Sequence, residues 1–361
     1  MFATVDDPPR AGYTGNLLTI AFSAWLLGGL LTDVWAHNNV PKLETFFTPW
    51  HAALYSGFLA TAAWICWLVR RNLMAGRRGA AAVPAGYLLG AFGVCLFLVA
   101  GAGDLTWHTI FGIERNARIL FSPTHLMLVT AIILIMTSPL RDMLADRSVP
   151  VAPTLRRLLP AILSIAFATV TLMVLLQYAN ILVQNPQGIV NALSRTNGSA
   201  TQVGEELIIT NLALLIPLLI LGRRWRLPFG TATLVYTVFG IQAEAVRALG
   251  TPMVFVTVVV AGVCVDLLIA WLRVTPTEKW RFWAFGALAP VVTWAVYFLI
   301  TFITVGSVPS VVEYWTGMPV IAGLLGLAVA ALMLPGAGGL AKPEAKPEAA
   351  PDKAQEEHQE A

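Results

Sequence analysis

The chain has 361 residues, of which 57% are hydrophobic and only 12% charged, and its formal net charge is +3. Soluble proteins carry about 25% charged residues, so this composition excludes a water-soluble domain, and the small net charge gives no nucleic-acid-binding surface. The three cysteines, Cys66, Cys95 and Cys264, lie in apolar runs without CxxC spacing, so neither a disulfide framework nor a thiolate zinc site is indicated.

Ten apolar segments follow one another along the chain, each close to the roughly 20 residues that a helix needs to cross a bilayer. They span residues 16–36, 50–69, 84–105, 123–140, 158–182, 206–222, 229–246, 253–273, 281–304 and 318–335. The polar, acidic start of the chain predicts that the first segment is a retained helix and not a cleaved signal. Because backbone groups must be paired inside lipid, we predict an all-α, polytopic transmembrane helical bundle of about ten helices.

Lysine and arginine are distributed unequally between the two sets of loops. Fourteen of them follow the second, fourth, sixth and eighth segments, whereas five lie in the loops on the opposite side. Positively charged short loops remain in the cytoplasm. We therefore predict an integral protein of the inner or plasma membrane with both termini cytoplasmic.

Residues 1–148, which contain the first four predicted helices, hold a repeated pattern of acidic and histidine residues. Both copies contain Asp-x3-His followed by Phe-Ser/Thr-Pro-x-His, and their first residues are separated by 71 positions. Only one of the five histidines, His358, lies outside this pattern. The candidate metal ligands are Asp33, His37 and His51 in the first copy, and Asp104, His108 and His125 in the second.

Asp and His at positions i and i+4 lie on one face of a helix, so both can reach one ion. Pro49 and Pro123 suit the first turn of the next helix, which brings a third ligand back to the same depth, on the extracytoplasmic side. Two imidazoles and one carboxylate suit copper, iron or zinc and leave positions open for oxygen or a substrate. The spacing does not decide between one dinuclear and two mononuclear sites. The alternative is a structural membrane protein in which these residues are helix caps and interfacial side chains.

Three glutamates are candidates for orienting the metal ligands without binding metal themselves: Glu44 and Glu114 in the two loops, and Glu244 near the outer end of the seventh helix. The alternative for each is ordinary ion pairing, with Arg247 as the partner of Glu244. Asp266, inside the eighth helix, is a candidate for proton transfer.

Residues 149–335 contain the fifth to tenth predicted helices, which carry no comparable motif. The segment at 183–204 is the longest predicted outer loop and a candidate cover for the metal site. Residues 336–361 are rich in Pro, Ala, Lys and Glu and have little to bury, so we predict a disordered cytoplasmic tail.

Residues 30–130 resemble the C subunit of the particulate methane and ammonia monooxygenases. The sequence FFTPWHAALY at 46–55 is similar to the end of that family's first motif, and DLTWH at 104–108 and FSPTH at 121–125 are similar to its second. The order and approximate separation of the two motifs are also similar. The sequence departs from the family in having Asp104 in place of Asn, and a single Glu in place of a pair.

This resemblance implies that Asp33, His37 and His51 form one copper site and that His108 and His125 contribute to a neighbouring one. It also implies a copper-dependent membrane monooxygenase that oxidises a small hydrophobic substrate with dioxygen. The expected partners are the lipid bilayer and either partner subunits, which would supply electrons, or further copies of the chain in a homo-oligomer. The alternative function is a non-catalytic membrane protein that acquires, stores or transfers copper or zinc.

Overall fold

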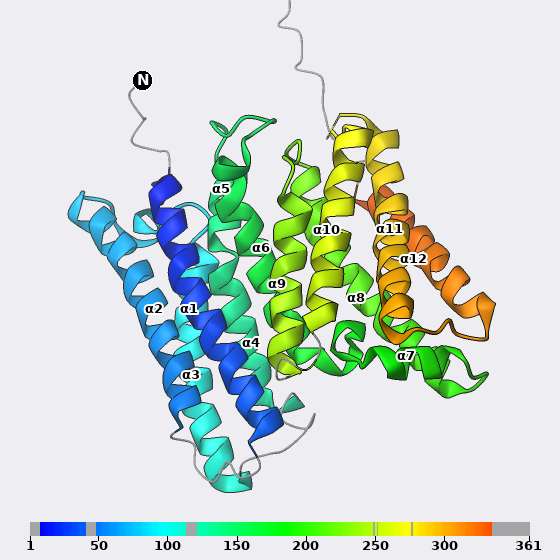
Figure 1. Cartoon of the computed structure of the whole chain (residues 1–361). Coiled ribbons are helices and arrows are strands. Elements are labelled where there is room, and N and C mark those ends of the chain that lie inside the picture. The colour runs from blue at the N-terminus through cyan, green and yellow to red at the C-terminus, as the bar shows by residue number, and fades with distance from the viewer. Residues whose placement is uncertain are drawn as a thin grey trace, which may run out of the picture.

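The computed structural model describes residues 8–40, 48–112, 121–247, 250, 252–275 and 277–333 (Figure 1). Glu44, Glu114 and the tail at 336–361 lie outside the described residues, so the predictions made for them stay predictions.

The described residues form α-helices joined by turns, and no strand occurs among them. Short 3-10 turns occur at η1 (Gly79–Ala82), η3 (Gln177–Ala179) and η4 (Ile181–Val183). The α-helices are α1 (Gly12–Asn39), α2 (Pro49–Met74), α3 (Leu88–Phe111), α4 (Pro123–Met136), α5 (Ser138–Ala145), α6 (Leu155–Leu175), α7 (Pro186–Leu193), α8 (Gly198–Gly222), α9 (Thr231–Val246), α10 (Pro252–Leu272), α11 (Lys279–Val305) and α12 (Val312–Leu332).

Nine helical segments of the described chain are long and apolar enough to cross a membrane, with α4 and α5 forming one of them. The tenth predicted segment is α9, which has 16 residues and runs beside α10 (Figure 1). Each of the ten predicted segments therefore corresponds to a helix. The prediction of an all-helical membrane bundle is confirmed, and the protein is an integral membrane protein.

Two predicted boundaries differ from the structure. The fifth predicted helix was expected to reach residue 182, but α6 ends at Leu175 and the chain continues in η3 and η4. Asn180 explains the change, because its side chain accepts a hydrogen bond from the Leu182 N–H (3.0 Å) and donates one to Gln242 (3.1 Å). The predicted outer loop at 183–204 contains α7 and the start of α8, where Asn185 and Asn197 cap the helices.

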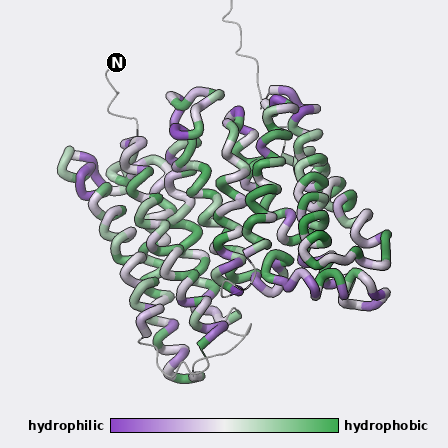
Figure 2. Tube along the Cα trace, viewed as in Figure 1, coloured by the Kyte–Doolittle hydropathy of each residue, from purple (hydrophilic) through white to green (hydrophobic). Residues whose placement is uncertain are grey.

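The helices of the N-terminal part pair as two hairpins, α1 with α2 and α3 with α4. Helix α6 contacts α1 and α4 on one side and α8 and α9 on the other, so it joins the two parts of the bundle (Figure 1). Hydrophobic residues follow the length of the helices and hydrophilic residues gather toward their ends (Figure 2). Large apolar side chains such as Leu59, Val99 and Leu324 are exposed on the outer faces, as expected where lipid is the solvent.

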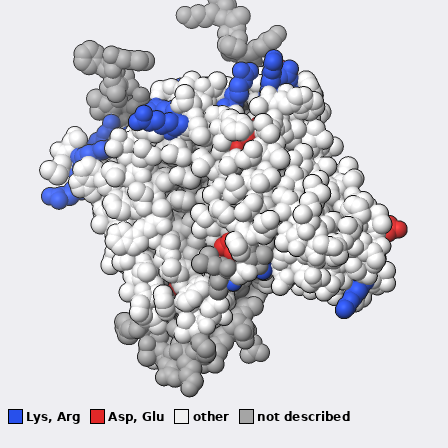
Figure 3. Space-filling view, viewed as in Figure 1, with Lys and Arg blue, Asp and Glu red and all other residues white. Residues whose placement is uncertain are grey.

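The two ends of the bundle differ in charge. Lys and Arg side chains are concentrated at the end where α1 begins, whereas the opposite end carries few of them on the face in view (Figure 3). The second residues of both Asp-x3-His pairs, His37 and His108, lie in the last turns of α1 and α3, at this opposite end.

Asp266 is fully buried in α10, where its carboxylate holds the start of α9. One oxygen accepts the Ala232 N–H (2.9 Å), and the other accepts the Thr233 N–H (2.9 Å) and hydroxyl (2.6 Å). The first N–H groups of a helix have no partner inside that helix, so a carboxylate from a neighbouring helix satisfies two of them and joins the two helices.

Candidate metal centre

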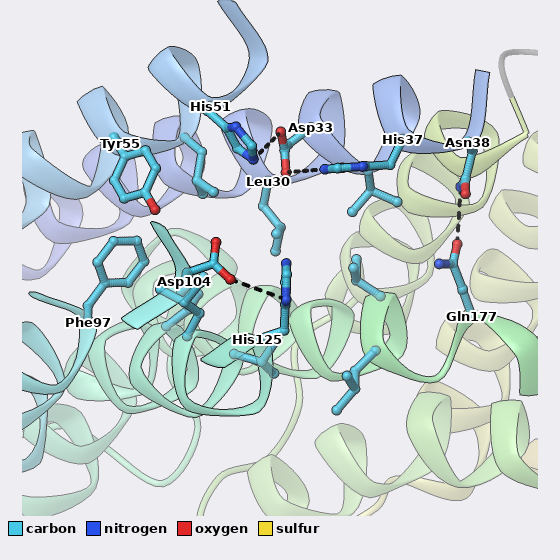
Figure 4. Close-up of a pocket in the computed structure, with 17 residues that line it drawn as sticks. Leu30, Asp33, His37, Asn38, His51, Tyr55, Phe97, Asp104, His125 and Gln177 are labelled. Carbon is cyan, nitrogen blue, oxygen red and sulfur yellow. Dashed lines mark hydrogen bonds and ion pairs between the residues drawn. The ribbon is translucent and has the colours of Figure 1, made fainter. Parts of the chain in front are cut away.

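The first Asp/His/His cluster joins α1 to α2. The Oδ2 atom of Asp33 lies 3.7 Å from His37 Nε2, and Asp33 Oδ1 lies 3.4 Å from His51 Nε2 (Figure 4). The rings of His37 and His51 are 5.8 Å apart between centroids. Asp33 and His51 are each 8% exposed, so this cluster lies inside the protein.

The second cluster joins α3 to α4 in the same way. Asp104 Oδ2 lies 3.6 Å from His108 Nε2, and Asp104 Oδ1 lies 3.4 Å from His125 Nδ1. The rings of His108 and His125 are 5.7 Å apart and nearly perpendicular. Asp104 is 2% exposed and His108 7%, so two members of this cluster are buried, while His125 is half-buried.

Local sequence explains how each cluster forms. The Asp and first His of each cluster are separated by one helical turn on α1 or α3, which puts them on one face. The second His follows a proline at the start of α2 or α4. Thr48 and Ser122 cap these helices by accepting the backbone N–H groups of His51 (3.1 Å) and His125 (3.2 Å).

Each cluster fits a metal ion by the chemistry and spacing of its donors. In both clusters one donor atom from each residue lies within 4.8 Å of the other two. Metal–ligand bonds of roughly 2.0–2.2 Å place neighbouring ligand atoms about 3.4 Å apart, close to the carboxylate–imidazole separations seen here. The sequence prediction that these six residues form two three-donor groups agrees with the structure.

An apolar pocket lies between the two clusters (Figure 4). Asp33, His37 and His51 reach it from one side, and Asp104 and His125 reach it from the other. Its volume is about 60 Å³. The remaining wall is mostly hydrophobic and includes Leu30, Val34, Leu54, Phe97, Leu128 and Ile132.

Tyr55 is a pocket residue that the motif analysis did not single out. Its ring packs edge-on against Phe97 at 5.8 Å between centroids, and it lies 6.3 Å from the ring of His51. Tyr55 follows His51 by four residues, so helical periodicity alone places it on the same face and could have found it. Tyr55 packs closely against Gly101 of α3, where a Cβ would lie 3.3 Å from the nearest carbon of the tyrosine ring.

Ser122 and Thr124 are also part of the second cluster, although the sequence analysis used them only as parts of a motif. The Thr124 hydroxyl donates to Asp104 Oδ1 at 2.9 Å, and Ser122 Oγ lies 2.6 Å from His125 Nδ1. The sequence signal for these two hydroxyl groups is their position: Ser122 and Thr124 lie three residues and one residue before His125.

Glu244 is buried near the end of α9 and does not line the pocket between the clusters. Neither of its carboxylate oxygens has a hydrogen-bond partner among the described residues. Its predicted role in orienting a metal ligand stays a prediction.

No protein-family model, no curated protein and no solved structure matches this chain. The chemistry of the two clusters therefore supplies the functional argument.

Proposed function

We propose that this integral membrane protein binds copper at its two Asp/His/His clusters and uses it to oxidise a small apolar molecule with dioxygen. The observation that carries this proposal is the placement of both clusters on one apolar pocket. A metal store needs ligands, but it does not need a hydrophobic chamber between them. The resemblance to the C subunit of the particulate monooxygenases supports the same choice.

The donor set allows copper, and the resemblance to the copper-dependent monooxygenases is what selects copper among the metals it allows. Imidazole suits copper, zinc and iron, and three protein ligands leave a coordination position open for an exogenous molecule. When bound, copper would supply the redox chemistry that activates dioxygen. Asp33, His37 and His51 would hold one ion, and Asp104, His108 and His125 the other. Iron and zinc are the alternatives, and the metal content of the purified protein distinguishes them from copper.

The pocket limits the size of a substrate. A volume of about 60 Å³ exceeds the roughly 10–15 Å³ that one water molecule needs and is well below the roughly 150 Å³ of a cavity that binds benzene. A molecule of a few heavy atoms fits this range. The hydrophobic wall favours an apolar molecule and excludes water from the reacting atoms.

The reaction needs electrons that the described residues do not supply. Hydroxylation of a C–H bond by dioxygen gives the alcohol and water, and consumes two electrons and two protons from an external reductant. We propose that a partner subunit or an electron-transfer protein delivers them. The Lys/Arg distribution supports placing the clusters at the extracytoplasmic surface.

The test begins with the metal content of the full chain, purified in detergent and loaded with Cu(I) or Cu(II). We expect copper at both clusters, loss of about half of it in His37→Ala or His108→Ala, and loss of nearly all of it in the double variant. His358→Ala is the matched control, because this histidine belongs to neither cluster. Wild-type protein that retains no copper, iron or zinc after gel filtration would refute metal binding.

Oxygen uptake then separates an enzyme from a binder. With a chemical reductant present, we expect uptake that depends on short alkanes and that falls in both single variants. Full copper occupancy without substrate-dependent uptake in membranes or detergent would instead support storage or transfer of the metal.

A further inference from the structure

A second pocket, of about 310 Å³, lies between α7 and the first part of α8 and shares no lining residue with the pocket between the Asp/His/His clusters. Helix α7 runs across the end of the bundle that lies opposite the end rich in Lys and Arg (Figure 1, Figure 3). Helix α8 is long and apolar enough to cross a membrane, and the ends of such helices lie among lipid headgroups. The second pocket therefore lies near the level of a membrane surface.

This pocket is lined largely by polar side chains, with one carboxyl group and one guanidinium group among its lining residues. Glu206 supplies the carboxyl group from α8, and Arg195 supplies the guanidinium group from the turn after α7. Glu206 is only 2% exposed, whereas Arg195 is an exposed residue. The acidic group therefore lies at the inner wall of the pocket and the basic group at its mouth.

The two carboxyl oxygens of Glu206 differ in their contacts. Oε1 accepts hydrogen bonds from the side-chain amides of Gln184 (2.9 Å) and Gln202 (2.9 Å), which also line the pocket. Oε2 is buried and has no hydrogen-bond partner among the described residues. An ionised Oε2 lacks a donor, and a protonated Oε2 lacks an acceptor for its O–H. Because buried polar atoms nearly always have a partner, either state calls for a molecule from outside this part of the chain.

The other lining residues indicate which kind of molecule this is. A bound Ca²⁺ or Mg²⁺ ion would need several oxygen ligands, and here a guanidinium group shares the pocket with a single carboxyl group. Quaternary ammonium groups are bound by aromatic side chains, and the pocket lining contains none. A primary ammonium group has three N–H donors, and Glu206 Oε2 and the side-chain oxygens of Ser199 and Asn191 are acceptors in the lining. The pocket therefore suits a primary ammonium group.

Arg195 indicates a second, anionic group on the same molecule. A guanidinium group binds phosphate and carboxylate groups through paired N–H donors. At a membrane surface, the headgroup that carries both a primary ammonium and a phosphate is ethanolamine phosphate. The pocket volume of about 310 Å³ lies at the lower end of the roughly 300–1,000 Å³ of small-molecule sites, which suits a group of this size.

We propose that the pocket between α7 and α8 binds an ethanolamine phosphate group, with the ammonium on Glu206 Oε2 and the phosphate at Arg195. Gln202 is exposed, so its amide can rotate away from Oε1 and admit the ammonium group. Two sources share this chemistry: the headgroup of phosphatidylethanolamine and free O-phosphoethanolamine. The site does not depend on metal binding elsewhere in the protein.

The first experiment measures binding of the soluble group by calorimetry, with the full chain in a maltoside detergent. We expect O-phosphoethanolamine to bind more tightly than phosphocholine. Glu206→Gln should weaken this binding by about 10-fold or more, since it removes the charged partner of a buried ammonium. Arg195→Gln should weaken it by about 2- to 5-fold, because this side chain is exposed. The matched control is Glu205→Gln, at an exposed neighbouring carboxylate outside the pocket lining, which should bind like the wild type.

The second experiment tests the lipid source. The protein is placed in nanodiscs that contain equal amounts of phosphatidylethanolamine and phosphatidylcholine with the same acyl chains, and native mass spectrometry identifies the lipid that it retains. We expect the wild type and Glu205→Gln to retain phosphatidylethanolamine, and Glu206→Gln to lose this preference. Retention of the lipid without binding of O-phosphoethanolamine supports the site with the lipid as its source, and the reverse result supports it with the free molecule as its source.

The proposal is overturned if the wild type prefers the ethanolamine compound in neither experiment, or if folded Glu206→Gln keeps the full preference. Binding of radioactive Ca²⁺ that is lost in Glu206→Gln, with no binding of either ethanolamine compound, would also overturn it. The thermal unfolding temperature of each variant shows whether it is folded. If Glu206→Gln does not fold, the exposed Arg195 carries the test, and binding in Arg195→Gln equal to that of the wild type counts against the site.

Discussion

At the scale of single residues, the Ser/Thr-Pro-x-His turn combines a structural and a chemical role. The hydroxyl of Thr48 or Ser122 accepts the N–H of the histidine three residues later. That N–H is one of the four that have no partner at a helix start, and the proline already has the backbone angle of the first turn. The same turn therefore begins a helix and fixes the backbone of a candidate metal ligand.

Asp266 provides a prediction at this scale, because it was a candidate for proton transfer and the structure places it as a cap on α9. Asp266→Ala leaves the buried N–H groups of Ala232 and Thr233 unpaired, which costs about 1–3 kcal/mol for each unsatisfied group. We expect a lower Tm in detergent, measured by tryptophan fluorescence. Glu313→Gln, at an exposed carboxylate in the first turn of α12, should leave Tm unchanged.

The proton-transfer hypothesis for Asp266 predicts a loss of turnover in a variant that still folds. If Asp266→Asn folds at low temperature and retains copper but loses substrate-dependent oxygen uptake, the carboxylate has a role in turnover beyond capping. If Asp266→Asn retains substrate-dependent oxygen uptake, capping of α9 is enough to explain this residue.

At the scale of elements, each Asp/His/His cluster depends on a close approach of two helices. In the first hairpin, a Cβ at Gly29 would lie 2.5 Å from Leu54 Cα, and a Cβ at Gly57 would lie 2.6 Å from Leu26 Cα. The contacts are reciprocal, so the backbones of α1 and α2 touch at two points. Small residues permit such close helix packing inside membranes. The second hairpin uses Gly93 of α3, where a Cβ would lie 2.8 Å from the carbonyl oxygen of Ala131 in α4.

Gly57→Ala tests whether this contact sets the geometry of the first cluster. The added methyl group must push α1 away from α2, which carries His51 away from Asp33 and destabilises the protein by about 1–3 kcal/mol. We expect weaker copper binding at the first cluster, with the second unaffected, measured by metal analysis in backgrounds that retain one cluster each. Gly28→Ala is the matched control, because nothing lies within 4 Å of a Cβ at that position. Equal copper binding in the Gly57 and Gly28 variants would contradict the prediction.

At the scale of the whole molecule, three parts of the bundle line the pocket: the α1–α2 hairpin, the α3–α4 hairpin and the end of α6. The α1–α2 and α3–α4 hairpins each bring one cluster, and Val174 and Leu175 at the end of α6 close the wall between them. Helix α6 also contacts α8 and α9, so these two helices pack against the helix that completes the pocket wall. Gln177 extends this support, because its side chain accepts a hydrogen bond from Asn38 at the end of α1 (3.2 Å).

The prediction at this scale concerns the orientation of the protein in the membrane. In a variant without native cysteines, Gln187→Cys in α7 and Arg78→Cys in the loop after α2 provide exposed labelling sites at opposite ends of the bundle. The positive-inside rule predicts that an impermeant maleimide labels position 187 on intact cells and position 78 only after permeabilisation. The reverse pattern would place the metal clusters at the cytoplasmic face.

The sequence by itself determined the helices, the duplicated hairpin and the six candidate ligands. Hydrophobic length and helical periodicity are local properties, and Asp33 with His37, or Asp104 with His108, share a face whatever surrounds them. The capped turns before His51 and His125 are also local, so each cluster could be predicted within its own hairpin. The end of α6 could not, because Asn180 acts through Gln242, a residue far along the chain.

Only the tertiary structure decided that the two clusters open onto one pocket. The placement of the hairpins depends on how α1 and α4 pack against each other and against α6. The residue pattern within one helix does not predict which other helices it contacts. The same holds for Asp266, whose partners lie more than 30 residues earlier, and for Tyr55, which packs closely against Gly101 on another helix. Contacts between distant segments arise from the packing of the whole bundle, and that packing places the pocket between the two Asp/His/His clusters.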